Sequence, residues 1–253
     1  RPGKRGARGK VNGGNLDVHP EYLKLALFEL FEENEVDYLL YSPVTDVIME
    51  GKAITGIEVT GKERVLRFHA KTVIDATGDG DVAFRAGCEM IEGREEDGLH
   101  MPSSLVFALA GVDTDRFFDY LYNHGGDESF RTLTSKERAK SEYLLTSWYG
   151  FDRTTIPGVI SVNNGGCADL NLDATRTGDL TALERLGIQI ALDFVDFVKE
   201  NNIPGMEHAV LMRTGSFVAV RDTRRLVGEY VLTEDDVMRG ADFDDRIARK
   251  YGY

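Results

Sequence analysis

The residues with the clearest chemical spacing lie at 78–83, where Gly-Asp-Gly-Asp-Val-Ala follows a short apolar run and precedes a helical pattern. This G-x-G-x-x-A spacing is typical of loops that hold the pyrophosphate of a dinucleotide at a helix N-terminus. The carboxylates of Asp75, Asp79 and Asp81 oppose phosphate binding, although they could accept hydrogen bonds from sugar hydroxyls. The alternative is a tight strand-to-helix turn, in which we expect Gly78 to adopt a left-handed or another glycine-only backbone conformation.

A second candidate is a group of four arginines within thirteen residues of an acidic chain: Arg213, Arg221, Arg224 and Arg225. Guanidinium groups can bind a carboxylate or phosphate through two parallel hydrogen bonds. Strand-like alternation would place Arg221 and Arg225 on one face and Arg224 on the other, so we expect the arginines to differ sharply in exposure. Neutralisation by the nearby Asp222 and Glu229 is an equally supported alternative.

His100 and Cys167 are further candidates with weaker support. His100 lies in a polar loop and could transfer protons, although a plain surface histidine has the same pattern. Cys167 follows two glycines that could expose its thiol, although a small buried residue is the alternative. The five histidines lack metal-ligand spacing and the chain contains no G-x-S-x-G motif, so we predict neither a metal site nor a serine nucleophile.

The hydrophobic pattern divides the chain into two regions, with the boundary placed between residues 97 and 98. Residues 1–97 are expected to form part of a doubly wound α/β domain, because a strand, a glycine turn and a helix follow one another at 72–86. This region also contains a predicted β-meander at about residues 37–70. Residues 98–253 mix strands and helices without a repeating βαβ order, which indicates an α+β domain with a mixed sheet.

Local periodicity gives the individual elements. Helices are predicted at 20–34, 82–86, 114–122, 135–147 and 181–201. Strands are predicted at 37–41, 45–50, 54–60, 65–70, 72–76, 104–111, 159–163, 168–172, 209–214 and 226–232. The helix at 181–201 is expected to begin with a capping box formed by Thr181 and Glu184, and residues 90–102 are expected to be a loop.

Composition excludes several classes of protein. The 253-residue chain has a formal net charge of −13, and such an acidic surface disfavours binding to nucleic acid or to anionic membranes. No apolar run approaches the ~18 residues of a membrane span. Two cysteines give no disulfide framework, which favours a reducing cytoplasm. The chain does not begin with Met, so we expect it to be cut from a longer protein.

Three ordered blocks carry a family resemblance. Lys71–Gly87 contains Ile-Asp-Ala-Thr-Gly-Asp-Gly-Asp, Val18–Lys24 opens a helix about fifty residues earlier, and Val220–Thr233 contains the paired arginines. In this order the blocks resemble the FAD-dependent oxidoreductase family that is allied to the glutathione-reductase and fumarate-reductase flavoproteins. The resemblance covers most of residues 18–240.

The resemblance implies that FAD is the cofactor and that the flavin exchanges hydride with a small-molecule substrate, for which the arginines favour an anion. It also implies that the FAD-contacting positions are Val44, Ala76, Thr77, Gly78 and Asp79, with the backbone of Val44 at the adenine. The candidates for catalytic contacts are Arg221, Arg225 and His100.

Two parts of the family pattern are missing. Family members begin with a βαβ unit that contains G-x-G-x-x-G and end with a block that closes over the flavin, and neither lies within this sequence. We therefore expect the central portion of a flavoenzyme, which by itself binds FAD weakly or not at all and is inactive. The alternative is a non-catalytic interaction or scaffold domain derived from a flavoprotein, which would be colourless when purified. The pattern leaves the substrate, the electron acceptor and the oligomeric state open.

Overall fold

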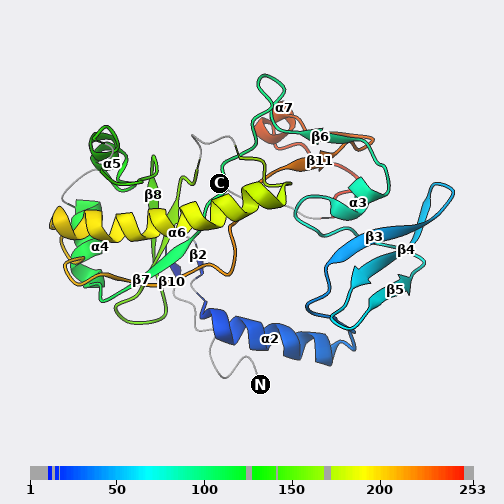
Figure 1. The fold of residues 1–253 in the computed structure, drawn as a ribbon, viewed down its shortest axis with the longest axis horizontal. Coiled ribbons are helices and arrows are strands. Elements are labelled where there is room, and N and C mark those ends of the chain that lie inside the picture. Colours follow the sequence, from blue (N-terminus) through cyan, green and yellow to red (C-terminus); the bar gives the residue numbers. More distant parts are fainter. Residues whose placement is uncertain are drawn as a thin grey trace.

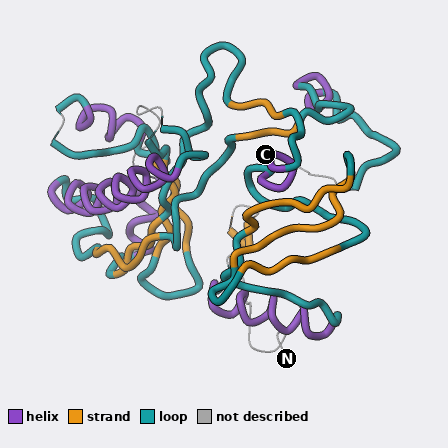
Figure 2. The backbone as a smooth tube through the Cα atoms, turned by 45° about the vertical axis from the view of Figure 1, so that its right-hand side comes forward, coloured by secondary structure: helices purple, strands orange, loops and turns teal. Residues whose placement is uncertain are grey.

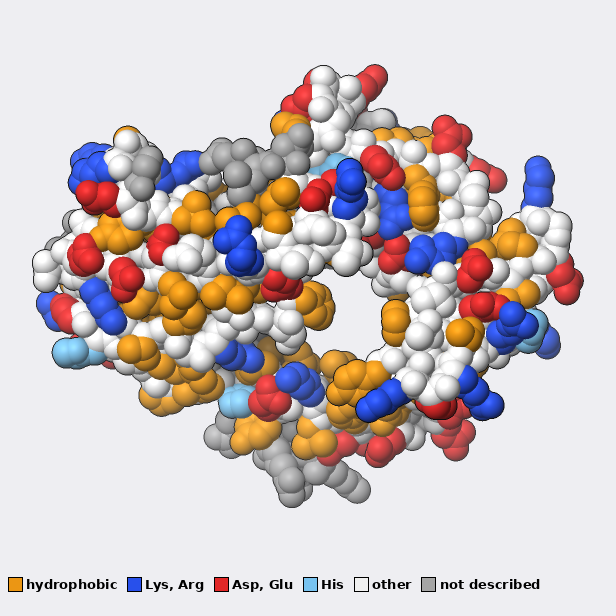
Figure 3. All heavy atoms as spheres, in the orientation of Figure 1, with side chains coloured by type: hydrophobic (Ala, Val, Ile, Leu, Met, Phe, Trp, Pro, Cys, Tyr) orange, Lys and Arg blue, Asp and Glu red, His pale blue; other side chains and the backbone are white. Residues whose placement is uncertain are grey.

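The computed structural model describes residues 18–123, 127–140, 142–167 and 172–247, together with the backbone of residues 11–12 and 15–16. The elements form two groups in both ribbon views (Figures 1 and 2). One group is built on a four-stranded sheet, and the other contains a three-stranded sheet and a two-stranded sheet. The space-filling view shows an opening between the groups, above helix α2 (Pro20–Glu33) (Figure 3).

The four-stranded sheet has the strand order β10-β7-β9-β8, with every neighbouring pair antiparallel. Its strands are β7 (Phe107–Ala110), β8 (Tyr149–Arg153), β9 (Ile160–Asn164) and β10 (Val210–Thr214). Three helices contribute to the same core: α4 (Thr114–Asn123), α5 (Arg131–Arg138) and α6 (Thr177–Glu200).

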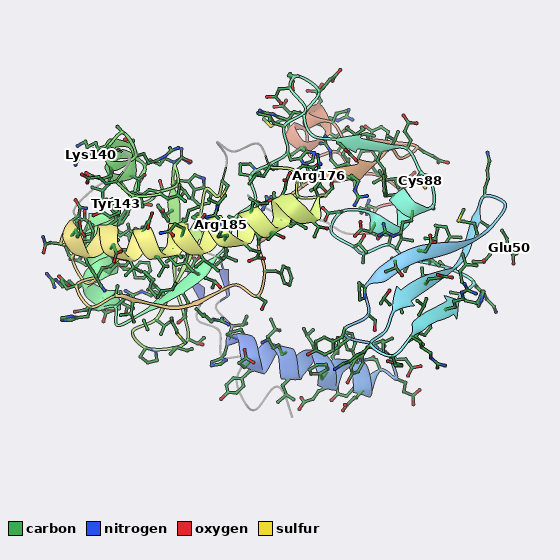
Figure 4. The ribbon with its side chains drawn as sticks, in the orientation of Figure 1. Glu50, Cys88, Lys140, Tyr143, Arg176 and Arg185 are labelled. Atoms are coloured by element: carbon green, nitrogen blue, oxygen red, sulfur yellow. The ribbon has the colours of Figure 1, made fainter. Side chains whose placement is uncertain are left out.

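Aromatic side chains fill this core. Phe194 of α6 is fully buried, and its ring centroid lies 4.3 Å from that of Tyr149 and 5.8 Å from that of Phe107. Burial of each such side chain contributes roughly 1.5–3 kcal/mol to folding. Tyr143, near the C-terminal end of α6, donates a hydrogen bond from its hydroxyl to Glu200 (Figure 4). The long helix is therefore held both through its buried face and at its end.

The second group begins with α2 and continues into an antiparallel meander. The meander strands are β3 (Val44–Glu50), β4 (Ala53–Thr60) and β5 (Val65–His69), followed by the short helix α3 (Asp81–Arg85). No residue of α2 is buried, so its apolar side chains lie at the surface of the described structure. Two short strands, β1 (Val11–Asn12) and β2 (Asn15–Leu16), pair before α2.

A late segment of the chain returns to the early region. Strand β11 (Arg224–Leu226) pairs antiparallel with β6 (Met90–Glu92), and Ser104 forms an isolated bridge with Ala219. Helix α7 (Glu234–Met238) follows, with a capping box between Thr233 and Asp236. The β6–β11 pairing joins residues on both sides of the 97/98 boundary and so places a late part of the second region beside the first. The division into two domains stays a prediction.

The mixed α/β class is confirmed. Neither the doubly wound sheet nor the mixed sheet predicted for residues 98–253 is found among the described residues, where every strand pair is antiparallel. The predicted strand at 72–76 is wrong: no described strand pairs with it, and Ile74 is 85% exposed. A strand needs a neighbour for its backbone groups, and an apolar run alone does not supply one. The strand predicted at 37–41 is also wrong, since Tyr41 adopts a left-handed φ of 56°.

Three predicted elements end or begin elsewhere because of contacts distant in sequence. The helix predicted at 135–147 ends at Arg138, and the backbone N–H of Leu144 donates instead to Asp193 of α6. The strand predicted at 226–232 ends at Leu226, which pairs with Met90, the first residue of its partner β6. Residues 90–92, expected to be loop, form that partner strand. The strand predicted at 168–172 falls almost wholly outside the described residues.

The predicted capping box of α6 is wrong as well. The helix begins at Thr177, so Thr181 lies inside it and donates its hydroxyl to the carbonyl of Thr177 at 2.8 Å. Glu184 accepts a hydrogen bond from the backbone N–H of Val218 at 2.5 Å. The side chain of Glu184 therefore joins the helix to another segment and does not cap it.

Candidate functional site

The turn at residues 75–81 is organised by the carboxylate of Asp75. One oxygen accepts from the N–H of Thr77 at 3.0 Å and from its hydroxyl at 2.6 Å, and the other accepts from the N–H of Ala83 at 3.0 Å. The Thr77 oxygen in turn accepts from the N–H of Asp81 at 2.7 Å. Burial raises the pKa of Asp75, but these hydrogen bonds outweigh it, so the pKa lies below its ordinary value.

The other two carboxylates of the turn are held by the segment around β11. Thr223, which is 1% exposed, donates its hydroxyl to Asp79. Arg224 donates to Asp81 at 2.6 Å, and its guanidinium carbon lies 4.2 Å from the centroid of the Phe84 ring. The negative charge that appeared to oppose phosphate binding is therefore engaged by protein groups on one side of the turn.

The opposite, solvent-facing side of the turn is open. Ala76 and Gly78 are exposed, and their backbone N–H groups donate to no described residue. The prediction that Gly78 is left-handed is wrong: Gly80, the N-cap of α3, has the left-handed φ of 62°. A Cβ at Gly80 would lie 2.9 Å from Cε of Met90, whereas a Cβ at Gly78 would meet nothing within 4 Å. Gly80 is thus required by the fold, and Gly78 leaves space beside the backbone.

Val44, the position expected at the adenine, is the first residue of β3 and is half-buried. Next to it, the carbonyl of Thr45 accepts a hydrogen bond from Nε of Arg85 at 2.9 Å. Arg85 is the last residue of α3, which begins where the 75–81 turn ends. This contact holds the start of β3 beside the helix that follows the turn, so the predicted FAD-contacting positions belong to one region.

The structure brings His100 and Arg225 together in a cleft of about 560 Å³, the His100 cleft. It is lined by Gly93, Arg94, Leu99, His100, Met101, Pro102, Ser103, Cys167, Leu172, Leu183, Asp222 and Arg225. Arg225 donates to the carbonyl of Gly93 at 2.8 Å, and its Nε lies 3.9 Å from Oδ2 of Asp222. Its side chain is 53% exposed, so the guanidinium group keeps donors for a ligand.

His100 is largely buried in this cleft, with a side chain 12% exposed. Its Nδ1 has no hydrogen-bond partner among the described residues and lies 3.7 Å from Oδ1 of Asp173. Burial raises the pKa of Asp173, but hydrogen bonds from Thr175 and the nearby His100 outweigh it and the pKa is lowered. Cys167 is half-buried, and burial raises the pKa of its thiol, which does not favour a reactive thiolate.

The arginines differ in exposure as expected. The side chain of Arg224 is 9% exposed and that of Arg225 is 53% exposed, because the two lie on opposite faces of the short strand β11. Arg221 precedes this strand, is exposed, and is not among the residues that line the His100 cleft. The internal ion-pair alternative therefore describes Arg224, whereas Arg225 combines an internal contact with a place in the cleft.

Sequence reasoning missed a larger cleft of about 810 Å³, the sheet cleft. It lies between the first turn of α2 and the four-stranded sheet, and its lining includes His19, Lys24, Ala108, Asp152, Arg153, Thr155, Ile156, Ser161, Met212 and Arg213. Its spacing in the sequence groups Arg213 with the other arginines, but the fold separates it from them. The cleft is formed by cross-strand neighbours, which local sequence patterns do not reveal.

No group of three or more His, Cys, Asp or Glu side chains among the described residues is arranged to hold a metal ion. No described helix combines the length and apolar character needed to cross a bilayer.

Comparison with known proteins agrees with the sequence resemblance. A search of the curated proteins gave no match, and a search of the solved structures gave none either. A family model described as FAD dependent oxidoreductase matches residues 3–252, which is nearly the whole chain. The chain therefore belongs to the FAD-dependent oxidoreductase family, and FAD is its cofactor.

Proposed function

We propose that this protein is an oxidoreductase that exchanges hydride between FAD and a small, anionic molecule held in the His100 cleft. One observation carries the proposal: four consecutive residues contribute to both the 75–81 turn and the His100 cleft. Thr223 and Arg224 hold the 75–81 turn, and Asp222 and Arg225 line the His100 cleft. The segment 222–225 thus joins the expected cofactor contact to the candidate substrate contact.

The residues of the turn fit FAD. The backbone at Ala76 and Gly78 is exposed and its N–H groups are free of described partners, as a surface lying against a cofactor requires. Engagement of Asp81 by Arg224 reduces the local negative charge that a phosphate would meet. When bound, FAD supplies the hydride chemistry, and the protein binds and orients the reactants.

Within the His100 cleft, the two charged side chains have different roles in the proposal. Arg225 binds the anionic group of the substrate through its free guanidinium donors. His100 carries a proton on Nδ1 towards the carboxylate of Asp173, which leaves Nε2 to exchange a proton with the substrate. A role for Arg221, which lies outside this lining, stays a prediction.

The proposal also concerns the fold of the cofactor-binding region and the location of the protein in the cell. We propose that the region around the 75–81 turn belongs to a doubly wound cofactor-binding domain, since a glycine turn leads there directly into helix α3. A cytoplasmic location is proposed because the two cysteines, Cys88 and Cys167, are both free thiols.

The experiment is anaerobic flavin reduction. The full-length flavoprotein to which this chain is expected to belong is loaded with FAD and mixed with a panel of small organic acids, and the loss of oxidised-flavin absorbance is followed. Arg225→Gln and His100→Gln are compared with Arg64→Gln, an exposed arginine beyond β4 that lies outside the cleft. For an acid that reduces the flavin, we expect the concentration that gives half-maximal reduction to be roughly tenfold higher in Arg225→Gln, with the FAD affinity unchanged.

Two results would contradict the proposal. A colourless full-length protein that binds no FAD would favour the scaffold alternative. Flavin reduction at equal rates in Arg225→Gln, His100→Gln and the control would place the substrate elsewhere.

A further inference from the structure

The floor of the sheet cleft is a row of four residues that cross the four-stranded sheet. The strand register places Arg213 of β10 opposite Ala108 of β7, Ala108 opposite Ser161 of β9, and Ser161 opposite Asp152 of β8. Residues directly opposite one another on neighbouring strands project from the same face. All four line the sheet cleft, on the face opposite the aromatic core.

The row carries opposite charges at its two ends and small side chains between them. Neighbouring strands are about 4.8 Å apart, so three strand spacings put the backbones of Arg213 and Asp152 roughly 14 Å apart. Neither side chain forms an ion pair with a described residue, although Glu21 of the same lining lies within electrostatic range of Arg213. Ala108 and Ser161 are too small to fill the space between them, so the row leaves a shallow floor that ends in a cation on one side and a carboxylate on the other.

A β-bulge shapes the cationic end. The register of β10 against β7 shifts between Leu211 and Arg213, so Met212 is an extra residue in the strand. As a result three consecutive residues, 212–214, line the cleft, where a regular strand would turn one of them away. Met212 is 48% exposed and supplies apolar surface beside the arginine.

The facing wall adds unpartnered polar atoms. Nδ1 of His19 and Oγ1 of Thr155 are both buried, and neither has a hydrogen-bond partner among the described residues. A buried polar atom without a partner is costly, and a ligand that bonds to it removes the cost.

The other charged groups of the lining are already engaged. Lys24 pairs with Glu21 at 2.9 Å, and Arg153 pairs with Asp115 at 2.9 Å while lying over the Phe118 ring. This leaves Arg213 and Asp152 as the charged groups of the cleft that are available to a ligand.

We propose that the sheet cleft binds a small amino acid-like molecule whose carboxylate and ammonium groups lie at opposite ends of an apolar body. Arg213 binds the carboxylate, Asp152 binds the ammonium group, and the apolar body lies over Ala108 and Met212. The cleft volume of about 810 Å³ is in the range of small-molecule sites. This site is separate from the His100 cleft, and the proposal goes beyond the redox function because it concerns binding alone.

The first test uses 4-(aminomethyl)benzoate, which has both a carboxylate and an ammonium group. Two matched probes accompany it: 4-methylbenzoate lacks the ammonium group, and 4-methylbenzamide lacks both charged groups. Methyl-labelled methionine provides the readout by NMR, because Met212 lines the sheet cleft and Met101 lines the His100 cleft. Substitutions Met212→Leu and Met101→Leu assign the two signals. We expect 4-(aminomethyl)benzoate to shift the Met212 signal more strongly than the Met101 signal.

The second test assigns the two ends of the ligand by calorimetry. Arg213→Gln should weaken binding of both carboxylate probes about tenfold, and Arg64→Gln should leave it unchanged. Asp152→Asn should weaken binding of 4-(aminomethyl)benzoate but not of 4-methylbenzoate. The proposal is overturned if Met212 does not respond to any probe, if Met101 alone responds, or if Arg213→Gln binds as the wild type does. Equal losses for both probes in Asp152→Asn would overturn the assignment of the ammonium group.

Discussion

Arg224 of β11 and Asp81 of α3 form an ion pair of 2.6 Å although they are 143 residues apart in the sequence. The arginine side chain is 9% exposed, and it also lies over the ring of Phe84. The ion pair thereby holds strand β11 against helix α3, which follows the 75–81 turn. The same strand places Arg225 in the His100 cleft, so this ion pair aligns the two parts of the proposed site.

Replacing Arg224 by Met should therefore destabilise the protein. The change leaves the carboxylate of Asp81 without its cation and removes a contact with an aromatic ring, so the free energy of unfolding should fall by roughly 1.5–3 kcal/mol. Arg221→Met, at an exposed position, should change it by no more than about 0.5 kcal/mol. Urea denaturation of both variants measures the difference, and equal stabilities would show that the pair is incidental.

Two glycines of α6 should respond in opposite directions to alanine. An ideal Cβ at Gly187 would lie 2.5 Å from Cβ of Leu105, a residue that is 2% exposed, so Gly187→Ala should cost roughly 1–3 kcal/mol. A Cβ at Gly178, in the first turn of the same helix, would meet nothing within 4 Å. Gly178→Ala should stabilise the helix by up to about 1 kcal/mol. Thermal unfolding of both variants tests the close packing of α6 on residue 105, which a harmless Gly187→Ala would refute.

Asp75→Asn should change how stability depends on pH. The folded-state pKa of Asp75 is lowered, so its contribution is present above about pH 3.9, the unfolded value, and is lost as pH falls through the folded value. Asn has one acceptor oxygen where Asp75 uses two, so stability at neutral pH should fall by roughly 1–2 kcal/mol.

Denaturation midpoints from neutral pH down to about pH 3 provide the measurement for Asp75→Asn. The variant should lose less stability on acidification than the wild type does. Asp37→Asn, at an exposed position, is the control and should follow the wild type. A variant curve parallel to that of the wild type would mean that Asp75 does not organise the turn.

Local sequence patterns predicted the elements that depend on their own residues. The meander strands and the end of α6 follow from alternation and from the stop at Asn201, and the structure places them within a few residues of the prediction. The start of α6 could not be predicted in the same way. Glu184 fitted a capping box, but its carboxylate bonds to the backbone of Val218, a contact that arises only after folding.

The candidate site likewise has features that local sequence patterns predict and features that arise only from contacts between distant segments. The spacing of 78–83 located the turn, but which glycine is left-handed depends on the helix that follows, and Gly80 holds that conformation. His100 and Arg225 are candidates for unrelated reasons in the sequence, and the pairing of β6 with β11 brings both to one cleft. The row from Arg213 to Asp152 had no local signal, because its members come from four strands.

The proposal that FAD lies against the exposed backbone of the 75–81 turn is tested most directly by FAD titration calorimetry on Gly78→Val, made in the full-length flavoprotein to which this chain is expected to belong. A side chain there meets no protein atom within 4 Å and Gly78 is not left-handed, so stability should change by no more than about 0.5 kcal/mol. Gly80→Ala is the comparison, and it should cost roughly 1 kcal/mol of stability because of its φ of 62°. We expect Gly78→Val to keep wild-type stability and to bind FAD at least about tenfold more weakly. Wild-type FAD affinity in Gly78→Val would contradict the proposal.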